Sequence, residues 1–204
     1  MDEAELVRWY GRWQPWTVKQ LVGLLEDWPH PWWIAGGHAL DAFTGLTRSH
    51  SDIDVAVFRR DIPALRAHLG TSYHCWAAGS GALRPLTADE PQLPGWADQC
   101  WVREHAGTPW RADILANPDR DGAWAFRRDP TIVLPLDAVV WRDADGTAFQ
   151  RTEITLAWKA KHHRPKDNAD LARTWPLLNP TERAWLRATL AQLHPGHPWL
   201  ARND

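Results

Sequence analysis

The residues best placed to do chemistry are two aspartates, Asp52 and Asp54, which stand two positions apart in the β-prone run 52–58. Alternate residues of a strand point to the same face and lie roughly 6–7 Å apart, so both carboxylates would share one surface. Their repulsion must be compensated by solvent or by a cation. Mg²⁺ prefers oxygen ligands and pairs with substrate phosphates. The pair is therefore either a solvated strand edge or part of a metal site.

A turn that suits a phosphate group precedes the two aspartates. Residues 32–35 form a short apolar run that predicts a buried strand, Gly36 and Gly37 follow, and residues 38–46 are predicted to be helical. Glycine lets the backbone approach a ligand closely, and a helix N-terminus offers N–H groups and a partial positive charge. A Gly-Gly pair alone is a weak signal. Strand, glycines, helix and paired aspartates in this order are far more specific.

Asp113 is a third candidate carboxylate. It lies in the apolar run 110–115, which predicts a strand. A carboxylate buried there without a partner is costly, so Asp113 needs a metal ion or an ion pair. Arg103 and Arg111 are the alternative partners.

The surrounding elements predict a mixed α/β region followed by helices. Apolar periodicity predicts helices over 15–27 and 61–69 and strands over 73–78, 100–105, 110–115, 131–134 and 138–141. Residues 79–99 are predicted to be mostly loop. The helical period returns at 152, with helices over 152–162 and 166–177 and a third that begins at Asn179 as its N-cap. We therefore expect two parts, 1–150 and 151–204.

The composition argues against several other classes of protein. The 204 residues carry 23 Lys and Arg against 25 Asp and Glu, and this net charge of −2 disfavours a basic protein that wraps nucleic acid. Two cysteines are too few for a disulfide framework or a four-cysteine zinc site. The first residues are acidic rather than an apolar leader, and no run approaches the ~20 apolar residues of a membrane span. We expect a cytoplasmic protein with no membrane partner.

Residues 31–58 resemble the nucleotidyltransferase superfamily that includes DNA polymerase beta, and they are most similar to its aminoglycoside 2″-nucleotidyltransferase branch. The resemblance is carried by Trp33-Ile34-Ala35-Gly36-Gly37, Ala39-Leu40-Asp41, Thr47-Arg48-Ser49-His50 and Asp52-Ile53-Asp54, in that order. His38 departs from the branch, which has Trp there. Residues 79–110 give no match, whereas 159–170 are similar to a helix-end motif of related members. The resemblance therefore supports the reaction better than the acceptor.

The resemblance implies an α+β fold, with a small mixed β-sheet nucleotidyltransferase core, helices on one side and a C-terminal helical subdomain. It also implies a two-metal transfer. Asp52, Asp54 and Asp113 would hold Mg²⁺, and Asp113 would be the general base. Gly36 and Gly37 would cradle the phosphates of ATP or another nucleoside triphosphate.

Basic residues would neutralise the triphosphate. The candidates are Arg48 and either Lys159 or Lys161, since three of the four Lys of the chain fall in residues 159–166. The alternative for these lysines is a solvated helix end. A structural ion-pair set is expected among Arg164, Lys166, Asp167 and Asp170. Asp41 and His50 either organise the site or have no role in it.

The acceptor is expected to be a small hydroxylated molecule, an aminoglycoside-like antibiotic. Such a polycation needs an acidic pocket and rings to stack on, for which the candidates are Asp89, Glu90, Asp98, Glu104, Trp96, Trp101 and Trp110. The alternatives are a lincosamide, a tRNA or a protein acceptor, or an inactive homologue that only binds. A tRNA would need Arg59, Arg60, Arg127 and Arg128 beside Asp52. The net charge of −2 otherwise disfavours nucleic acid as a partner.

Overall fold

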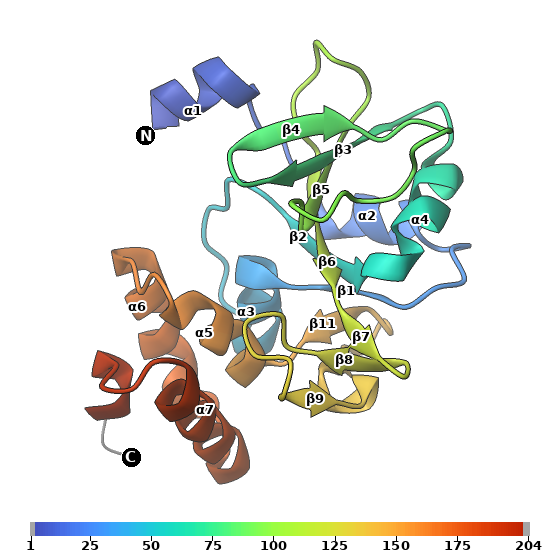
Figure 1. The fold of residues 1–204 in the computed structure, drawn as a ribbon. Helices are drawn as coiled ribbons and strands as arrows, with labels where there is room; N and C mark the ends of the chain where they lie inside the picture. Colours follow the sequence, from blue (N-terminus) through green and yellow to red (C-terminus); the bar gives the residue numbers. More distant parts are fainter. Residues whose placement is uncertain (1–2, 202–204) are drawn as a thin grey trace.

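An eight-stranded mixed sheet forms the centre of the computed structural model, which describes residues 3–201 (Figure 1). Its strands lie in the order β10-β11-β1-β2-β6-β5-β3-β4. Their bounds are β1 Trp32–Ile34, β2 Asp54–Phe58, β3 His74–Gly79, β4 Ala82–Pro85, β5 Gln99–Arg103, β6 Ala112–Asn117, β10 Val140–Arg142 and β11 Ala148–Gln150. A second, small sheet consists of β7 Asp119–Arg120, β8 Ala123–Ala125 and β9 Val133–Leu134.

The helices lie on both sides of this sheet. Their bounds are α1 Glu3–Tyr10, α2 Val18–Leu24, α3 Gly36–Thr44, α4 Ile62–Leu69, α5 Thr152–Ala160, α6 Pro165–Thr174 and α7 Pro180–Leu193. In Figure 1, α2 and α4 lie together on one side, and α5, α6 and α7 gather on the other, next to α3. Single 3₁₀ turns span Arg59–Asp61, Leu136–Ala138, Trp175–Leu177 and Pro198–Ala201.

The alternation of β2 divides the hydrophobic core into two clusters. Val55 and Val57 point to the cluster that contains Leu21 of α2 and Leu65 of α4. Phe58, from the opposite face of β2, joins the cluster of the C-terminal helices. Because successive side chains of a strand point to opposite faces, one strand anchors both cores. The face that Asp54 shares with Phe58 is therefore the face that the C-terminal helices approach.

Local capping signals explain where two helices begin. The Thr17 hydroxyl accepts a bond from the backbone N–H of Gln20, and the Gln20 side chain bonds back to the Thr17 backbone. The same reciprocal box joins Asn179 and Glu182 ahead of α7, so the predicted N-cap is confirmed. Each box satisfies N–H groups that have no partner inside the helix.

Several elements differ from the sequence-based prediction. Helix α3 begins at Gly36 rather than at 38, because the two glycines form its first turn and Ala35 is the N-cap. Helix α1 and strands β4, β7 and β8 were not predicted, because these short segments lack a sustained apolar period. The strand predicted over 131–134 is confirmed in part as β9 of the small sheet. The strands predicted over 100–105 and 110–115 are confirmed as β5 and β6, which pair antiparallel.

The predicted α+β class with a mixed sheet is confirmed, but the helices cover both faces of the sheet rather than one side, because each face of β2 carries its own hydrophobic cluster. The division at residue 150 stays a prediction, since β11 ends at Gln150 and α5 begins at Thr152 while both contribute to one core. Within residues 3–201, no helix has the length and apolar character that crossing a membrane requires.

Candidate active site

The sheet brings the predicted carboxylates together. Strands β2 and β6 are parallel neighbours, and Asp54 stands opposite Asp113 in their register. Asp52 comes just before β2, and its charge raises the pKa of both other aspartates. Three carboxylates from two separate segments thus lie within electrostatic reach of one another.

Burial makes two of these carboxylates, Asp54 and Asp113, difficult to ionise. Desolvation and then the charge of Asp52 raise the pKa of Asp54 to about 7, although Lys159, Lys166 and Arg164 pull it down. Desolvation and the charges of Asp54 and Asp52 raise the pKa of Asp113 well above its ordinary value.

Asp113 keeps one oxygen available inside the protein. The side chain is only 6% exposed, and its Oδ2 accepts a hydrogen bond from Gln99 Nε2 at 2.7 Å. Its Oδ1 is buried and has no hydrogen-bond partner among the described residues. The arginines considered as partners are engaged elsewhere: Arg111 pairs with Glu104, and Arg103 stacks on Trp76 and Trp110. A buried acceptor without a donor is a position for a cation or a proton.

The two glycines pack directly against this site. Gly36 has a φ of +60°, and a Cβ built on it would overlap the Asp54 carboxylate. A Cβ on Gly37 would overlap the His50 ring and crowd the Arg48 guanidinium. The close approach of backbone and side chains explains why glycine is needed at both positions.

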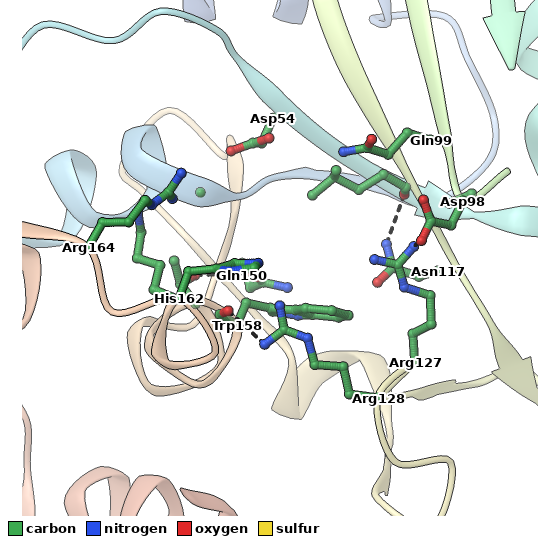
Figure 2. A pocket seen from close by; sticks show the side chains of 15 residues that line it. Asp54, Asp98, Gln99, Asn117, Arg127, Arg128, Gln150, Trp158, His162 and Arg164 are labelled. Carbon is green, nitrogen blue, oxygen red and sulfur yellow. Dashed lines mark hydrogen bonds and ion pairs between the residues drawn. The ribbon is translucent and has the colours of Figure 1, made fainter. Parts of the chain in front are cut away.

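A cavity of about 270 Å³ opens next to Asp54 (Figure 2). In that view Asp54 and Trp158 lie on opposite sides, Arg164 lies at one end, and Arg127 and Arg128 lie at the other. The lining comes from the first residues of α3, β2 and β5, the residue before β5, the last residues of β6, β11, α5 and the loops that follow β8 and α5. The lining residues are Gly36, Asp54, Asp98, Gln99, Leu115, Ala116, Asn117, Arg127, Arg128, Gln150, Thr155, Trp158, Lys159, His162 and Arg164. The cavity thus separates the sheet from the C-terminal helices.

Cationic side chains dominate the polar lining. Arg127, Arg128, Lys159 and Arg164 face two acidic residues, Asp54 and Asp98. Desolvation and the neighbouring Arg127 charge lower the pKa of Arg128 to about 10, so Arg128 still carries its charge at neutral pH. It donates to the Trp158 carbonyl at 2.7 Å and stacks on the Trp158 ring. A cavity of this charge suits an anion with several phosphates.

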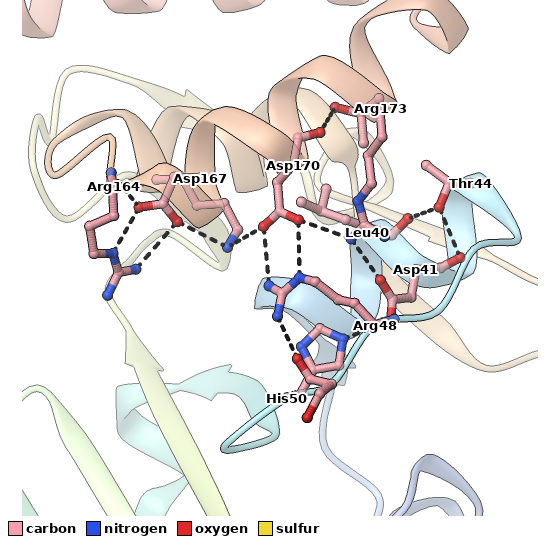
Figure 3. Close-up of polar contacts among 12 residues, drawn as sticks. Leu40, Asp41, Thr44, Arg48, His50, Arg164, Asp167, Asp170 and Arg173 are labelled. Carbon is pink, nitrogen blue, oxygen red and sulfur yellow. Dashed lines mark hydrogen bonds and ion pairs between the residues drawn. The ribbon is translucent and has the colours of Figure 1, made fainter. Parts of the chain in front are cut away.

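The predicted basic residues differ in where they lie. Lys159 lines the cavity, whereas Lys161 is exposed and lies outside the lining. Arg48 donates to Asp170 through Nε and Nη2 (Figure 3). Their binding of a triphosphate stays a prediction.

The residues predicted to form an acidic acceptor pocket are mostly engaged elsewhere. Asp98 lines the cavity and pairs with Arg127, while Glu104 pairs with Arg111. Glu90 pairs with Arg84, and Asp89 is exposed. Trp101 and Trp110 belong to an aromatic cluster with Tyr10, Trp13 and Trp76. Trp96 is exposed.

Two of the four arginines considered for a tRNA acceptor lie away from the cavity. Arg127 and Arg128 line it, but Arg59 donates to the carbonyls of residues 93, 94 and 97. Arg60 pairs with Asp119 and stacks on Phe58. The basic surface that a tRNA would need is therefore not assembled beside Asp52 from these four residues.

Several lining residues were missed by the sequence analysis. Trp158, Gln99 and Gln150 gave no signal of their own, because their place in the cavity depends on how α5, β5 and β11 pack. Trp158 was one of 16 Trp, and nothing in its spacing distinguished it from a core residue.

The carboxylates have the chemistry of a magnesium site without forming a complete one. No group of three His, Cys, Asp or Glu side chains within residues 3–201 is already arranged to hold a metal ion. The buried free oxygen of Asp113 and the hard oxygen donors of Asp54 and Asp52 still fit Mg²⁺, which is usually bound by one or two carboxylates together with substrate phosphates and water.

One family of known proteins matches part of the sequence. A family model described as aminoglycoside-2''-adenylyltransferase matches residues 17–75, which include α2, β1, α3, β2, Asp52 and Asp54. No curated protein matches the sequence.

Solved structures resemble a larger part of the chain. The solution structure of the antibiotic-resistance factor ANT(2'')-Ia covers 86% of this chain and 89% of its own, with a TM-score of 0.58 and 16% identity. The crystal structure of ANT(2'')-Ia with adenylyl-2''-tobramycin covers 86% and 95%, with a TM-score of 0.56 and 14% identity. The lincomycin-bound lincosamide antibiotic adenylyltransferase LnuA covers 78% and 97%, with a TM-score of 0.51 and 18% identity.

The chain thus has the fold of the nucleotidyltransferases, a class of enzymes. Within this class, its segment 17–75 is similar to the aminoglycoside-2''-adenylyltransferases. The similarity predicted from the sequence is confirmed, and so is the prediction of an enzyme of this class, since the matched family and the structural neighbours are adenylyltransferases.

Proposed function

We propose that the chain is a Mg²⁺-dependent nucleotidyltransferase that moves a nucleoside monophosphate, AMP from ATP, onto a hydroxyl group of a small antibiotic-like acceptor and releases pyrophosphate. The observation that carries this proposal is the pairing of Asp54 with Asp113 beside Gly36 and a cationic cavity. The matched aminoglycoside-2''-adenylyltransferase model supports the same chemistry.

The three aspartates would divide the work at the reacting phosphate. Asp52 and Asp54 would hold Mg²⁺, which would stabilise charge on the attacking and leaving oxygens. Asp113 would share a metal ion and accept the proton of the acceptor hydroxyl, and its free Oδ1 is the atom available for this. A neighbouring cation lowers the pKa of a carboxyl group, so a bound metal would keep Asp113 ionised.

The cationic cavity is best assigned to the donor nucleotide. Lys159 and Arg164 lie near Asp54, since both lower its pKa, and they would neutralise the triphosphate. Gly36 and Gly37 would let the backbone approach the phosphates. A polycationic acceptor would be repelled by this lining, so it must reach Asp113 from another direction.

The acceptor is best placed on the Trp101 side of Asp113. Trp101 stands opposite Asp113 in the sheet and packs against Tyr10 and Trp13. Rings of this kind stack on sugars and other apolar faces. An aminoglycoside is supported by the family match.

A lincosamide is the second candidate acceptor. Asp98 and Glu104 are already paired with arginines, which leaves less acidic surface for a polycation. A lincosamide carries fewer positive charges and depends less on such a surface.

Pyrophosphate release tests this proposal. The four common nucleoside triphosphates are each incubated with Mg²⁺ and with an aminoglycoside panel, a lincosamide panel or tRNA. We expect release that depends on ATP and on an antibiotic acceptor. Release with tRNA alone would show that the acceptor is tRNA rather than an antibiotic. Nucleotide binding without release would favour an inactive binding homologue.

We expect Mg²⁺ affinity to fall steeply in mild acid. The pKa of Asp54 is raised to about 7, so a proton competes with the metal below that pH. Affinity should fall by up to about tenfold for each pH unit below 7. Calorimetric titration of Mg²⁺ in the presence of a non-hydrolysable ATP analogue at pH 6, 7 and 8 measures this. A flat profile would contradict the assignment of Asp54 as a metal ligand.

A further inference from the structure

Three cationic side chains converge on one buried carboxylate, Asp170 of α6 (Figure 3). Arg48 donates to both of its oxygens at 3.2 and 3.1 Å. Lys159 Nζ lies 3.0 Å from Oδ2, and Arg173 Nη2 lies 3.1 Å from Oδ1. Asp170 is only 1% exposed. Burial raises its pKa, but the bonds from Arg48 and Lys159 outweigh burial and hold the pKa below the ordinary value.

Lys159 is held from two sides and still faces the cavity. Its Nζ also lies 3.4 Å from Asp167, a carboxylate with no exposed surface. The side chain of Lys159 is 11% exposed and lines the cavity beside Asp54. An ammonium group has three donors. With two directed at Asp170 and Asp167, the third is left for the cavity.

Arg48 fixes Asp170 to the segment that leads to the catalytic aspartates. Its Nη1 donates to the carbonyl of Ser49 at 2.9 Å, and its backbone N–H donates to Asp41 at 3.2 Å. Each of the three guanidinium nitrogens of Arg48 thus donates to a protein oxygen. One carboxylate therefore joins three elements: the segment ahead of Asp52, the end of α5 and α6.

We propose that Asp170 is a positioning residue for nucleotide binding, which orients the Lys159 ammonium toward the triphosphate and is itself held in place by Arg48. The proposal rests on the proposed function, because it assumes that the cavity binds the donor nucleotide. It gives the predicted 159–170 motif a role: its lysine contacts the nucleotide, and its aspartates orient that lysine. Burying a lysine against two carboxylates costs free energy unless the charges are well matched. The fixed orientation of the ammonium group then favours binding, because less conformational entropy is lost when the ligand binds.

The alternative is a purely structural ion cluster. Arg173 shows how such a cluster would work, since it bridges Asp170 and Asp41 at 3.1 and 2.6 Å and lies outside the cavity lining. A structural role would lower the stability of the protein without acting through Lys159. The two roles are separated by asking whether the effect of Asp170 depends on Lys159.

A double-mutant cycle on ATP affinity tests the proposal. Binding of MgATP without acceptor is followed by tryptophan fluorescence for wild type, Asp170→Asn, Lys159→Ala and the double variant. We expect Asp170→Asn to weaken binding about tenfold in the wild type and less than about twofold when Lys159 is already alanine, since residues in one network are not additive. Arg60→Met is the control, because Arg60 pairs with Asp119 away from the cavity, and its affinity for MgATP should be unchanged.

Each other outcome overturns the proposal. An equal loss from Asp170→Asn in both backgrounds would assign it a structural role, and no loss in the wild type would remove it from nucleotide binding. If Asp170→Asn does not fold, Arg48→Met replaces it in the same cycle with the same expectation. Failure of the wild type to bind MgATP would instead overturn the proposed function, and this inference with it.

Discussion

Replacement of Asp54 or Asp113 by asparagine should abolish nucleotidyl transfer and make the protein more stable. Each carboxylate is assigned to the reacting centre, so we expect a loss of at least about a thousandfold in turnover, comparable to the removal of other groups that stabilise a transition state. Both aspartates face each other across β2 and β6 and are hard to ionise. Asparagine keeps the shape of the side chain and removes the charge.

The gain in stability follows from the sign of the pKa shift. A carboxyl group whose pKa is raised by folding contributes fully to stability only below its pKa in the unfolded chain, near 3.8. That stability is lost as the pH rises through its pKa in the folded protein, about 7. At pH 8 the ionised Asp54 therefore opposes folding. Discounted for the partial exposure of Asp54, its removal should add about 1–2 kcal/mol to the free energy of unfolding.

Thermal unfolding at pH 8 and pH 5 measures this gain. We expect the melting temperature of Asp54→Asn to exceed that of the wild type by about 2–4 °C at pH 8 and by less at pH 5. The exposed Asp27 is the matched control, and Asp27→Asn should change neither activity nor melting temperature. A stable variant that keeps its activity would remove Asp54 from the reacting centre.

The second large effect is expected from one methyl group on Gly36. The Gly36→Ala substitution places a Cβ into the Asp54 carboxylate and forces a φ of +60° on a residue with a side chain. We expect turnover to fall about a hundredfold, since a shift of about 1 Å in a catalytic group has this effect. Stability should fall by about 1–2 kcal/mol.

Gly23 provides the matched control for this substitution. It lies inside α2, and a Cβ built on it would meet no atom within 4 Å. Gly23→Ala should therefore keep full activity and stabilise the helix by up to about 1 kcal/mol. Steady-state kinetics and thermal unfolding of both variants complete the comparison. Equal behaviour of the two would contradict the close approach of Gly36 to Asp54.

The proposed catalytic centre was predictable because its signals are local. Gly36, Gly37, Asp52 and Asp54 lie within 19 consecutive residues, 36–54. Asp54 is the first residue of β2 and Asp52 lies two residues before it. Asp113 was predicted as a buried carboxylate in a strand, and its register with Asp54 places it in the same centre. The resemblance, not the spacing, supplied the role of Asp113.

The cavity was less predictable because packing, rather than any local pattern, assembles it. Arg128, Trp158 and Gln150 come from three segments that meet only when the C-terminal helices close on the sheet. Three of the four acidic residues predicted around the acceptor are paired with arginines in the fold, and these pairs have no sequence signature. The acceptor is therefore the part of the function on which the sequence and the fold give the least information.

The most direct test of the central claim is mass spectrometry of the acceptor. Wild type and Asp54→Asn are each incubated with MgATP and a mixture of aminoglycosides and lincosamides. We predict that one acceptor gains the mass of a single adenylyl group with the wild type and remains unchanged with the variant. Unchanged acceptors with the wild type, despite bound MgATP, would contradict a transferase that acts on these antibiotics. An adduct formed equally by both proteins would contradict the assignment of the site.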